Sequence, residues 1–463
     1  MTDKELFYDK KPGFDRLKKE EQQAVHFYAE GYKNFLDEGK TERDAAAYMV
    51  RQAEAHGFRP YKRGEALQPG DRIYKVNREK GIVMAIIGQE SLTKGAQITA
   101  AHIDSPRIDI RTIPVYEDDN LAFFKTHYYG GIKKYQWTTI PLELRGVVSR
   151  YTDRGLENID IHIGNKPEDP VFVITDLLPH LASQQMQKPM VKGIEAEKMN
   201  ILIGSVPDES EEETSNKVKR AVMKFLNNTY GITEEDFLSA EIAAVPAFNA
   251  RDIGFDRSMI GAYGHDDRVC AYPAATALFD LDEIPAKTAI CLLVDKEEIG
   301  SEGVTGMKSQ FFDMFLNDLC RSQNVLREDL CENSTCLSAD VSNAYDPNYP
   351  EVSDKRNDAK MNCGLIITKY TGARGKSETN DASAELMAKI RYIMRDICWQ
   401  TGQLGKVDQG GGGTVAMYMA SRNIETVDAG VPVLSMHAPF EVIAKLDLYM
   451  AYQGFGVFYR FEK

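Results

Sequence analysis

The sequence lacks any C-x-x-C pair, and its seven cysteines are scattered singly between Cys270 and Cys398. An odd number of isolated thiols argues against a disulfide framework. The nearest pair, Cys331 and Cys336, is better explained as free buried thiols than as metal ligands. We therefore predict a reducing compartment and a cytoplasmic location.

Long apolar runs are missing as well. No stretch approaches the ~18 uncharged apolar residues of a membrane span. The N-terminal MTDKELFYDKKPGFDRLKKEE is charged throughout and has no apolar core of a secretory signal. Basic residues are in the minority, because 56 Lys and Arg against 70 Asp and Glu give a net charge of -14. Phosphate binding needs a basic face, so neither nucleic acid nor a membrane is expected as a partner.

One glycine-rich segment, Gln409–Thr414, has the composition of a phosphate loop but lacks the Lys-Ser/Thr that completes one. Two interpretations stay open for it. The glycines allow a close backbone approach to a substrate or metal site, or they form a plain flexible turn.

The chain does contain the apolar patterns of a globular enzyme, and its 463 residues allow two or three domains. One helix face is predicted by the i, i+3, i+4 spacing of Val25, Tyr28, Ala29, Tyr32, Phe35 and Leu36. A second helix is expected from Thr41 to Gly57. Strands covered on both faces are predicted for three non-alternating apolar runs, Ile82–Ile87, Gln97–Ala101 and Thr288–Val294.

The middle of the chain has a different sequence pattern. Short β-type runs appear there at Glu143–Val148, Ile159–Ile163 and Val171–Ile174. The acidic run Asp208–Thr214 is interpreted as a solvated loop and not as a metal site. We therefore expect an α/β domain formed by residues 1–110 and 246–463, interrupted by a smaller β-rich insertion at 111–245.

Two short motifs near predicted strand and helix ends carry polar groups. His102 and Asp104 follow an apolar strand two residues apart, so both side chains point the same way if the chain stays extended. A carboxylate beside a histidine can hold the tautomer that a metal ligand needs. Asp266 and Asp267 precede a helix-like stretch at 269–278, where they either cap the helix or supply one carboxylate that bridges two metal ions.

Three further acids and one histidine complete the pattern. Glu297 and Glu298 follow the strand Thr288–Val294, and adjacent carboxylates at such a strand end are costly without a cation. An exposed charged turn is the alternative. Asp340 and His437 also follow apolar runs, and each alone is more often structural. Together, two imidazoles and three carboxylates suit two zinc-like ions that share one carboxylate. The remaining Glu can then move the proton of an activated water.

Five stretches resemble the M18 family of metallo-aminopeptidases, the aspartyl aminopeptidase group, and more distantly the M42 and M20 families. They are AAHIDSPR, GHDDRVCAY, VDKEEIGSEG, LSADVSNAYDPNYP and SMHAPFE, in the family's order over nearly the whole chain. The resemblance implies the following roles: His102 and Asp340 bind one divalent ion, Glu298 and His437 bind the other, Asp266 bridges both, Glu297 is the general base and Asp104 orients His102. It implies two metal ions, zinc first and cobalt or manganese as alternatives. The family usually has Asp-Asn where this chain has Asp266-Asp267, so the choice of bridging acid stays open.

The resemblance also implies an architecture. We expect a mixed sheet sandwiched by helices, of the zinc-peptidase, phosphorylase/hydrolase-like type, with the insertion as a β-rich dimerisation domain. Relatives assemble into a hollow dodecamer built from dimers, in which a histidine from a neighbouring subunit enters the active site. His180 resembles that residue, and the alternative for it is an ordinary surface or core histidine.

The chain departs from the aspartyl-specific members at several positions. Asn343 and Asp346 stand where those members often carry histidines. Lys369, Arg374 and Lys376 fall in their substrate-recognising basic segment, where a cation can pair with an acidic side chain or remain a solvated face. A neutral or apolar N-terminal residue of the substrate therefore stays open beside an acidic one.

The leading hypothesis is a metal-dependent aminopeptidase acting on peptides. One alternative is another metal amidase, a deacylase or carboxypeptidase, with the same ligands and a different pocket. The other is a non-catalytic assembly protein, which requires a lost ligand or base, and none of the seven chemical positions is lost.

Overall fold

The computed structural model describes Leu6, Tyr8 and residues 12–209 and 215–462. Residues 210–214 of the predicted acidic loop lie outside this part. The chain divides into two compact units. The first comprises Met1–Asp104, Ala250–Met436 and Phe440–Lys463, and the second comprises Ser105–Asn249 with His437–Pro439.

The first unit is built on a nine-stranded mixed sheet. In spatial order its strands are β1 (Arg59–Pro60), β2 (Arg72–Val76), β3 (Ile82–Ile86), β14 (Thr288–Val294), β4 (Ala96–His102), β15 (Thr335–Ser338), β19 (Glu425–Gly430), β17 (Leu365–Thr368) and β18 (Trp399–Thr401). Every residue of β3, β4 and β14 is buried. The three apolar runs therefore form central strands, as the sequence predicts.

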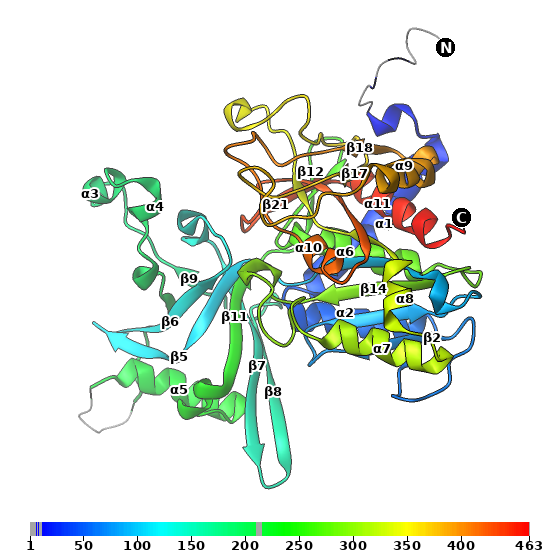
Figure 1. Cartoon of the computed structure of the whole chain (residues 1–463). Coiled ribbons are helices and arrows are strands. Elements are labelled where there is room, and N and C mark those ends of the chain that lie inside the picture. The colour runs from blue at the N-terminus through cyan, green and yellow to red at the C-terminus, as the bar shows by residue number, and fades with distance from the viewer. Residues whose placement is uncertain (1–5, 7, 9–11, 210–214, 463) are drawn as a thin grey trace. The chain divides into compact units, whose positions relative to one another are not determined.

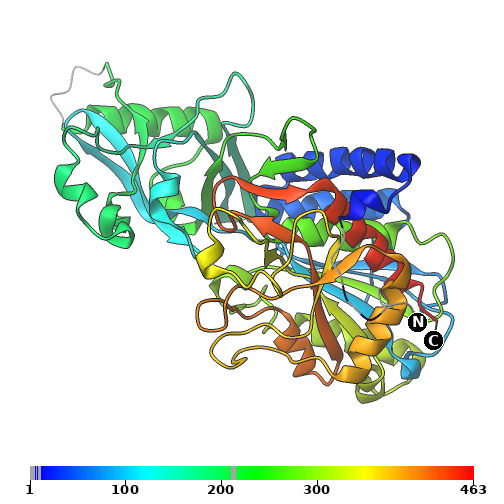
Figure 2. The ribbon, with the colours of Figure 1, turned by 90° about the horizontal axis from the view of Figure 1, so that it is seen from above.

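Helices cover both faces of this sheet. On one face are α1 (Lys19–Glu38), α2 (Glu42–Ala55), α6 (His265–Phe279), α9 (Ala384–Ile393) and α11 (Lys445–Tyr459); on the other are α7 (Phe311–Gln323), α8 (Arg327–Glu332) and α10 (Ala416–Ala420). Along β3, Met84 joins the first core and Val83 the second, because strand side chains alternate between faces. Figures 1 and 2 show α1 and α2 on one side of the sheet and α7 on the other. The predicted sandwich of helices around a mixed sheet is confirmed.

The first two helices follow the predicted pattern closely. In α1 the residues Val25, Ala29, Tyr32, Phe35 and Leu36 are buried, and Tyr28 is partly buried against the same core. At the start of α2 the Thr41 hydroxyl accepts the backbone N–H of Asp44 at 3.2 Å, which caps the helix. The helix ends at Ala55, and Gly57 has a φ of +81°, a conformation that glycine adopts readily.

The direction of the strands decides where the polar motifs lie. Strands β14, β4, β15 and β19 run parallel to one another. Their carboxyl ends therefore share one edge of the sheet, where open α/β sheets hold their ligands. His102 ends β4, and the segments that carry Glu297 and Asp340 follow β14 and β15 directly.

A smaller five-stranded sheet supports this edge. Its order is β12 (Arg251–Ile253), β13 (Met259–Ala262), β21 (Glu441–Ala444), β20 (Pro432–Leu434) and β16 (Ser342–Asn343). Strand β13 leads into α6, so this sheet fixes the position of the Asp266–Asp267 segment at the start of that helix.

The second unit contains a seven-stranded sheet whose paired strands run antiparallel. The order is β8 (Gly155–Ile163), β7 (Leu142–Thr152), β11 (Ala240–Pro246), β5 (Arg107–Asp118), β6 (Leu121–Tyr129), β10 (Ile201–Gly204) and β9 (Val173–Ile174). Helix α5 (Lys217–Tyr230) contacts β5, β6 and β10, and α3 (Ser183–Met186) and α4 (Met190–Gly193) are single turns. None of the helices in the described part of the chain combines the length and apolar character that a bilayer crossing requires.

Candidate metal centre and active site

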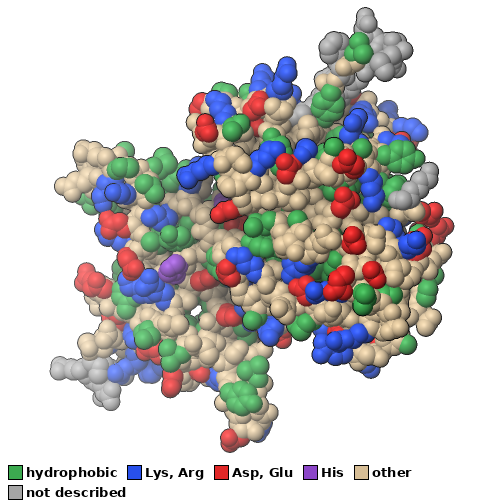
Figure 3. Space-filling model, in the orientation of Figure 1, with side chains coloured by type: hydrophobic (Ala, Val, Ile, Leu, Met, Phe, Trp, Pro, Cys, Tyr) green, Lys and Arg blue, Asp and Glu red, His purple; other side chains and the backbone are tan. Residues whose placement is uncertain are grey.

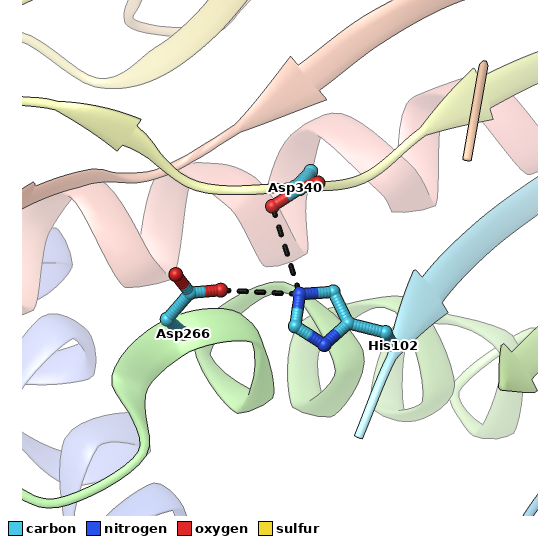
Figure 4. A group of neighbouring side chains, drawn as sticks. All are labelled: His102, Asp266 and Asp340. Atoms are coloured by element: carbon cyan, nitrogen blue, oxygen red, sulfur yellow. Dashed lines mark ion pairs between the residues drawn. The ribbon is translucent and has the colours of Figure 1, made fainter. Parts of the chain in front are cut away.

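One buried imidazole lies at the centre of the candidate site. The His102 side chain is 1% exposed, and its Nε2 atom lies 3.1 Å from Asp266 Oδ1 and 3.8 Å from Asp340 Oδ1 (Figure 4). The same nitrogen lies 3.9 Å from Oε2 of Glu297. Three carboxylates from distant segments thus surround one nitrogen atom, an arrangement that suits a cation.

Asp104 connects this imidazole to the glutamate turn. Its Oδ1 atom lies 3.2 Å from Nδ1 of His102 and accepts the backbone N–H of Glu297 at 3.2 Å. Its Oδ2 atom accepts the backbone N–H of Glu298 at 3.2 Å. The carboxylate is fully buried, so these contacts fix both the imidazole and the start of the turn after β14.

The two glutamates lie on that turn, which begins after Lys296 in a left-handed conformation (φ +69°). Donor atoms of His102, Glu297 and Glu298 lie within 4.8 Å of one another, and so do those of His102, Asp266 and Asp340. Four acids around one imidazole in a largely buried place repel one another unless a cation is bound. The donor set, imidazole nitrogen with carboxylate oxygens, is one that zinc accepts.

The electrostatics of the cluster show the same need for a cation. Burial, followed by the negative charge of Asp267, raises the pKa of Asp340 well above its usual value. Burial alone lowers the pKa of His102, but the hydrogen bonds to Asp104 and Asp266 outweigh it and hold that pKa well above the usual value. A divalent cation favours the ionised acid and the neutral imidazole, so it opposes both pKa shifts. The residues therefore fit a metal ion.

Of the two adjacent acids, Asp266 is the one that joins the cluster. Both Asp266 (φ -80°, ψ 109°) and Asp267 (φ -116°, ψ 32°) depart from helical geometry at the start of α6. Among the described residues, the groups able to hold a metal include Asp266 and do not include Asp267. Asp267 is fully buried, and burial raises the pKa of its carboxyl group well above the usual value. The geometry therefore favours Asp266 over Asp267 as a metal ligand.

His437 lies in the turn between β20 and β21. These two strands pair within the five-stranded sheet of the first unit, and the turn residues 437–439 cluster with the second unit. The Nδ1 atom of His437 lies 2.7 Å from the Gly131 carbonyl oxygen in that second unit. Donation from Nδ1–H leaves Nε2 as the nitrogen with a lone pair for a metal.

His180 is exposed in a turn of the second unit, beside α3. Its neighbours Leu178 and Leu181 are 50% and 69% exposed. Exposed leucines thus flank this histidine in the sequence, and its entry into an active site remains a prediction.

The two predicted substrate-binding cations, Lys369 and Arg374, lie in the segment that follows β17. Lys369 pairs with Asp381, and Lys376 lies 2.8 Å from the same carboxylate. Both Thr368 and Ser338 align with Asp428, but β17 runs antiparallel to β19 and β15 runs parallel to it. Lys369 therefore leaves the sheet in the direction opposite to Asp340. Arg374 is exposed in a turn and has a φ of +48°.

One polar residue of the site escaped the sequence analysis. Glu441 is 1% exposed, and its Oε2 atom accepts the backbone N–H of Asp266 at 3.1 Å. It is the last residue of the SMHAPFE stretch, so the motif carried a signal for it. His265, by contrast, contacts Tyr32 Oη at 2.8 Å and the Ile260 carbonyl at 3.1 Å. Burial lowers its pKa to about 3, so it is a neutral structural histidine.

The chain is similar to known proteins over nearly its whole length. Residues 35–459 match the family model described as Aminopeptidase I zinc metalloprotease (M18). A relative from Clostridium acetobutylicum, named Probable M18 family aminopeptidase 1, is 46% identical over 464 residues, which is 98% of this chain and 99% of the relative. A crystal structure of an M18-family aminopeptidase from Thermotoga maritima has a TM-score of 0.92 at 42% identity, covering 98% of this chain and 100% of that one. The S. cerevisiae mApe1 dodecamer shares the fold at 18% identity, with a TM-score of 0.76 over 93% of this chain and 96% of that one.

Proposed function

Because this chain belongs to the M18 family of zinc aminopeptidases, and is therefore a metal-dependent enzyme that removes the N-terminal residue from peptides, we propose that it uses two zinc ions at the carboxyl edge of the nine-stranded sheet. Cobalt or manganese are the alternative ions. The family match and the names of the relatives decide for an aminopeptidase over the deacylase, the carboxypeptidase and the non-catalytic assembly protein.

The proposed ligands divide into two sets that share one acid. They are His102 and Asp340 for the first ion, Glu298 and His437 for the second, and Asp266 for both. The observation that carries this assignment is the approach of the Asp266 and Asp340 carboxylates to Nε2 of His102, at 3.1 and 3.8 Å. Glu298 has a donor atom in the same cluster, within 4.8 Å of a donor atom of His102. His437 is included because it precedes Glu441 by four residues, a span of at most about 14 Å, and Glu441 holds the backbone of Asp266.

When bound, such ions lower the pKa of a water molecule and polarise the peptide carbonyl. Glu297, on the turn after β14, is proposed as the general base that takes the water proton and passes it to the leaving amine. Asp104 accepts Nδ1–H of His102, which keeps the lone pair on Nε2. Glu441 holds the backbone of Asp266 and thereby the position of the shared carboxylate.

The stoichiometry of the metal tests this proposal. Chelator-stripped enzyme titrated with zinc is expected to bind two ions per chain, and activity is expected to return with them. Asp266→Asn is expected to weaken the binding of both ions. Asp282→Asn, a change at an exposed acid of the same unit, is expected to leave the affinity for both ions unchanged. Full activity after exhaustive metal removal, or a single ion per active chain, contradicts the two-ion assignment.

We propose that the second unit mediates self-association, with a dodecamer built from dimers as the final assembly. Exposed apolar side chains gather on and around α3 and α4 (Figure 3): Leu177, Leu178, Leu181, Met186, Met190 and Val191 are each at least 50% exposed. Apolar groups gathered in this way mark a contact surface. The yeast relative is described as a dodecamer. In such an assembly His180 is proposed to reach the active site of a neighbouring copy.

Two narrower proposals concern substrate and location. We propose a neutral or apolar N-terminal residue as the preferred substrate, because Asp381 already pairs with Lys369 and Lys376. Arg374 remains the candidate partner for any acidic side chain. We also propose a cytoplasmic location, supported by the seven cysteines, which are all free and buried.

A further inference from the structure

A cavity of about 370 Å³ lies in the first unit and takes no part in the chemistry proposed above. It is lined mainly by Lys308, Asp313, Arg327, Tyr418 and Arg422, all of which belong to that unit. Its volume falls in the range of small-molecule sites, roughly 300–1,000 Å³. We call it the Arg327 pocket.

The charge of this pocket is opposite to that of the chain as a whole. The chain carries a net charge of -14, yet the pocket lining holds three cations and one carboxylate. Like charges brought together in a concave place repel one another, and a bound anion relieves that repulsion. The lining therefore selects for a negatively charged ligand.

Arg422 and Asp313 form the fixed part of the lining. The Nε and Nη2 atoms of Arg422 lie 3.0 and 2.7 Å from Oδ2 of Asp313, and Nη1 donates to the Tyr418 carbonyl at 2.7 Å. The Arg422 side chain is 13% exposed, so the pair is largely withdrawn from water. A guanidinium used in this way holds the shape of the pocket and keeps Asp313 neutralised.

Arg327 has donors to spare. Its Nη1 atom lies 3.1 Å from Oδ1 of Asp313. Within residues 12–209 and 215–462 no other hydrogen-bond partner of Arg327 is seen, so the Nε and Nη2 donors remain for a ligand. The side chain is 36% exposed, which leaves the guanidinium accessible from the pocket.

Lys308 supplies a second available cation. Its Nζ atom lies 2.5 Å from Oε1 of Glu302 and 5.7 Å from the ring centroid of Tyr418. The Glu302 side chain is 70% exposed, and an ion pair so open to water contributes little to stability. A ligand in the pocket can therefore draw the ammonium group away from Glu302.

We propose that the Arg327 pocket binds the phosphate group of a small molecule. A phosphate group offers three terminal oxygens, so it can accept from the Arg327 fork and from the Lys308 ammonium at once. The planar fork of Arg327 matches two of those oxygens, and the Tyr418 hydroxyl adds a neutral donor. This site is separate from peptide hydrolysis and does not depend on the two-ion proposal.

Calorimetric titration of the zinc-loaded, full-length enzyme with inorganic phosphate tests the proposal. Phosphate also binds zinc, so the decisive quantity is the difference in phosphate affinity between the wild type and the pocket variants. Arg327→Gln is expected to weaken the pocket component by about tenfold or more, as for loss of a charge-assisted hydrogen bond. Arg321→Gln is the matched control, because Arg321 is 71% exposed on α7 and does not line the pocket.

Lys308→Gln gives an independent measurement of phosphate affinity. It replaces Arg327→Gln as the test if circular dichroism shows that Arg327→Gln does not fold. Saturable binding that both pocket variants lose and Arg321→Gln keeps supports the site. Absence of binding, or equal binding in all variants, overturns it, since the phosphate is then absent or at the metal centre alone. Succinate is the second probe, and succinate binding tighter than phosphate overturns the assignment of a phosphate group.

Discussion

The Oδ1 atom of Asp104 lies 3.2 Å from Nδ1 of His102, and both side chains are almost completely buried. The same carboxylate accepts the backbone N–H groups of Glu297 and Glu298, which lie 193 and 194 residues further along the chain. One acid therefore aligns an imidazole on β4 with the two glutamates that follow β14. This contact makes the geometry of the centre depend on a residue that is not itself proposed as a ligand.

Asp104→Asn is expected to weaken zinc binding and to lower kcat/KM by about 10- to 100-fold, as for loss of a group that orients a metal-bound histidine. The amide cannot accept Nδ1–H and both backbone N–H groups as well as a carboxylate does. Zinc affinity by competition with a chelating dye, together with the pH profile of kcat, separates this effect from simple unfolding. Unchanged zinc affinity and pH profile would falsify the orienting role, and Asp256→Asn at an exposed turn serves as the control.

Glu297→Gln is expected to keep the fold and both zinc ions while lowering kcat by roughly 10²- to 10⁴-fold, because the amide cannot carry a proton from water to the leaving amine. Steady-state kinetics on an aminoacyl-nitroanilide and zinc content by mass spectrometry measure the two quantities. The matched control is Glu302→Gln, a change at an exposed glutamate five residues further along. Turnover near the normal rate in Glu297→Gln removes this residue from the mechanism.

Much of the fold and of the site was predictable because the apolar runs of the sequence show where the buried strands end. The continuous apolar runs of β3, β4 and β14 indicate strands buried on both faces, and polar residues directly after such runs must lie at a sheet edge. Since β14 and β4 run parallel, their ends meet, which brings Glu297 within 3.9 Å of His102. Periodicity likewise indicated the buried face of α1.

Other features depend on pairings that the sequence does not display. Strand β17 runs antiparallel to β19 in an otherwise parallel region, and this reversal carries Lys369 away from Asp340. Glu441 lies in a motif, but its hydrogen bond to the Asp266 backbone joins residues 175 positions apart, and the sequence does not display which group this carboxylate contacts. Strands β7 and β8 extend well past the predicted apolar runs, because their outer parts pair with each other and expose polar residues.

A panel of aminoacyl substrates tests the proposed preference for neutral or apolar first residues. We expect leucyl and alanyl substrates to be cleaved with a higher kcat/KM than aspartyl or glutamyl substrates. Lys369→Ala is expected to change every rate by no more than about twofold, since an exposed lysine paired with Asp381 contributes little. A selective loss of aspartyl cleavage in Lys369→Ala, with leucyl cleavage intact, contradicts the preference. Arg374→Ala shows whether Arg374 contributes to any remaining cleavage of aspartyl and glutamyl substrates.

The apolar surface around His180 is expected to hold the assembly together. Leu178 and Leu181 are 50% and 69% exposed within their own unit, so a charge placed on both will be buried without a partner if a second copy covers them. Sedimentation velocity should show the wild type far above its 52.0 kDa chain mass and the double variant Leu178→Lys, Leu181→Lys in much smaller species. Leu326→Lys, at a leucine of the first unit that is 67% exposed, should leave the assembly intact. A fully active wild-type monomer, or a double variant that assembles normally, contradicts both the contact surface and the sharing of His180 between subunits.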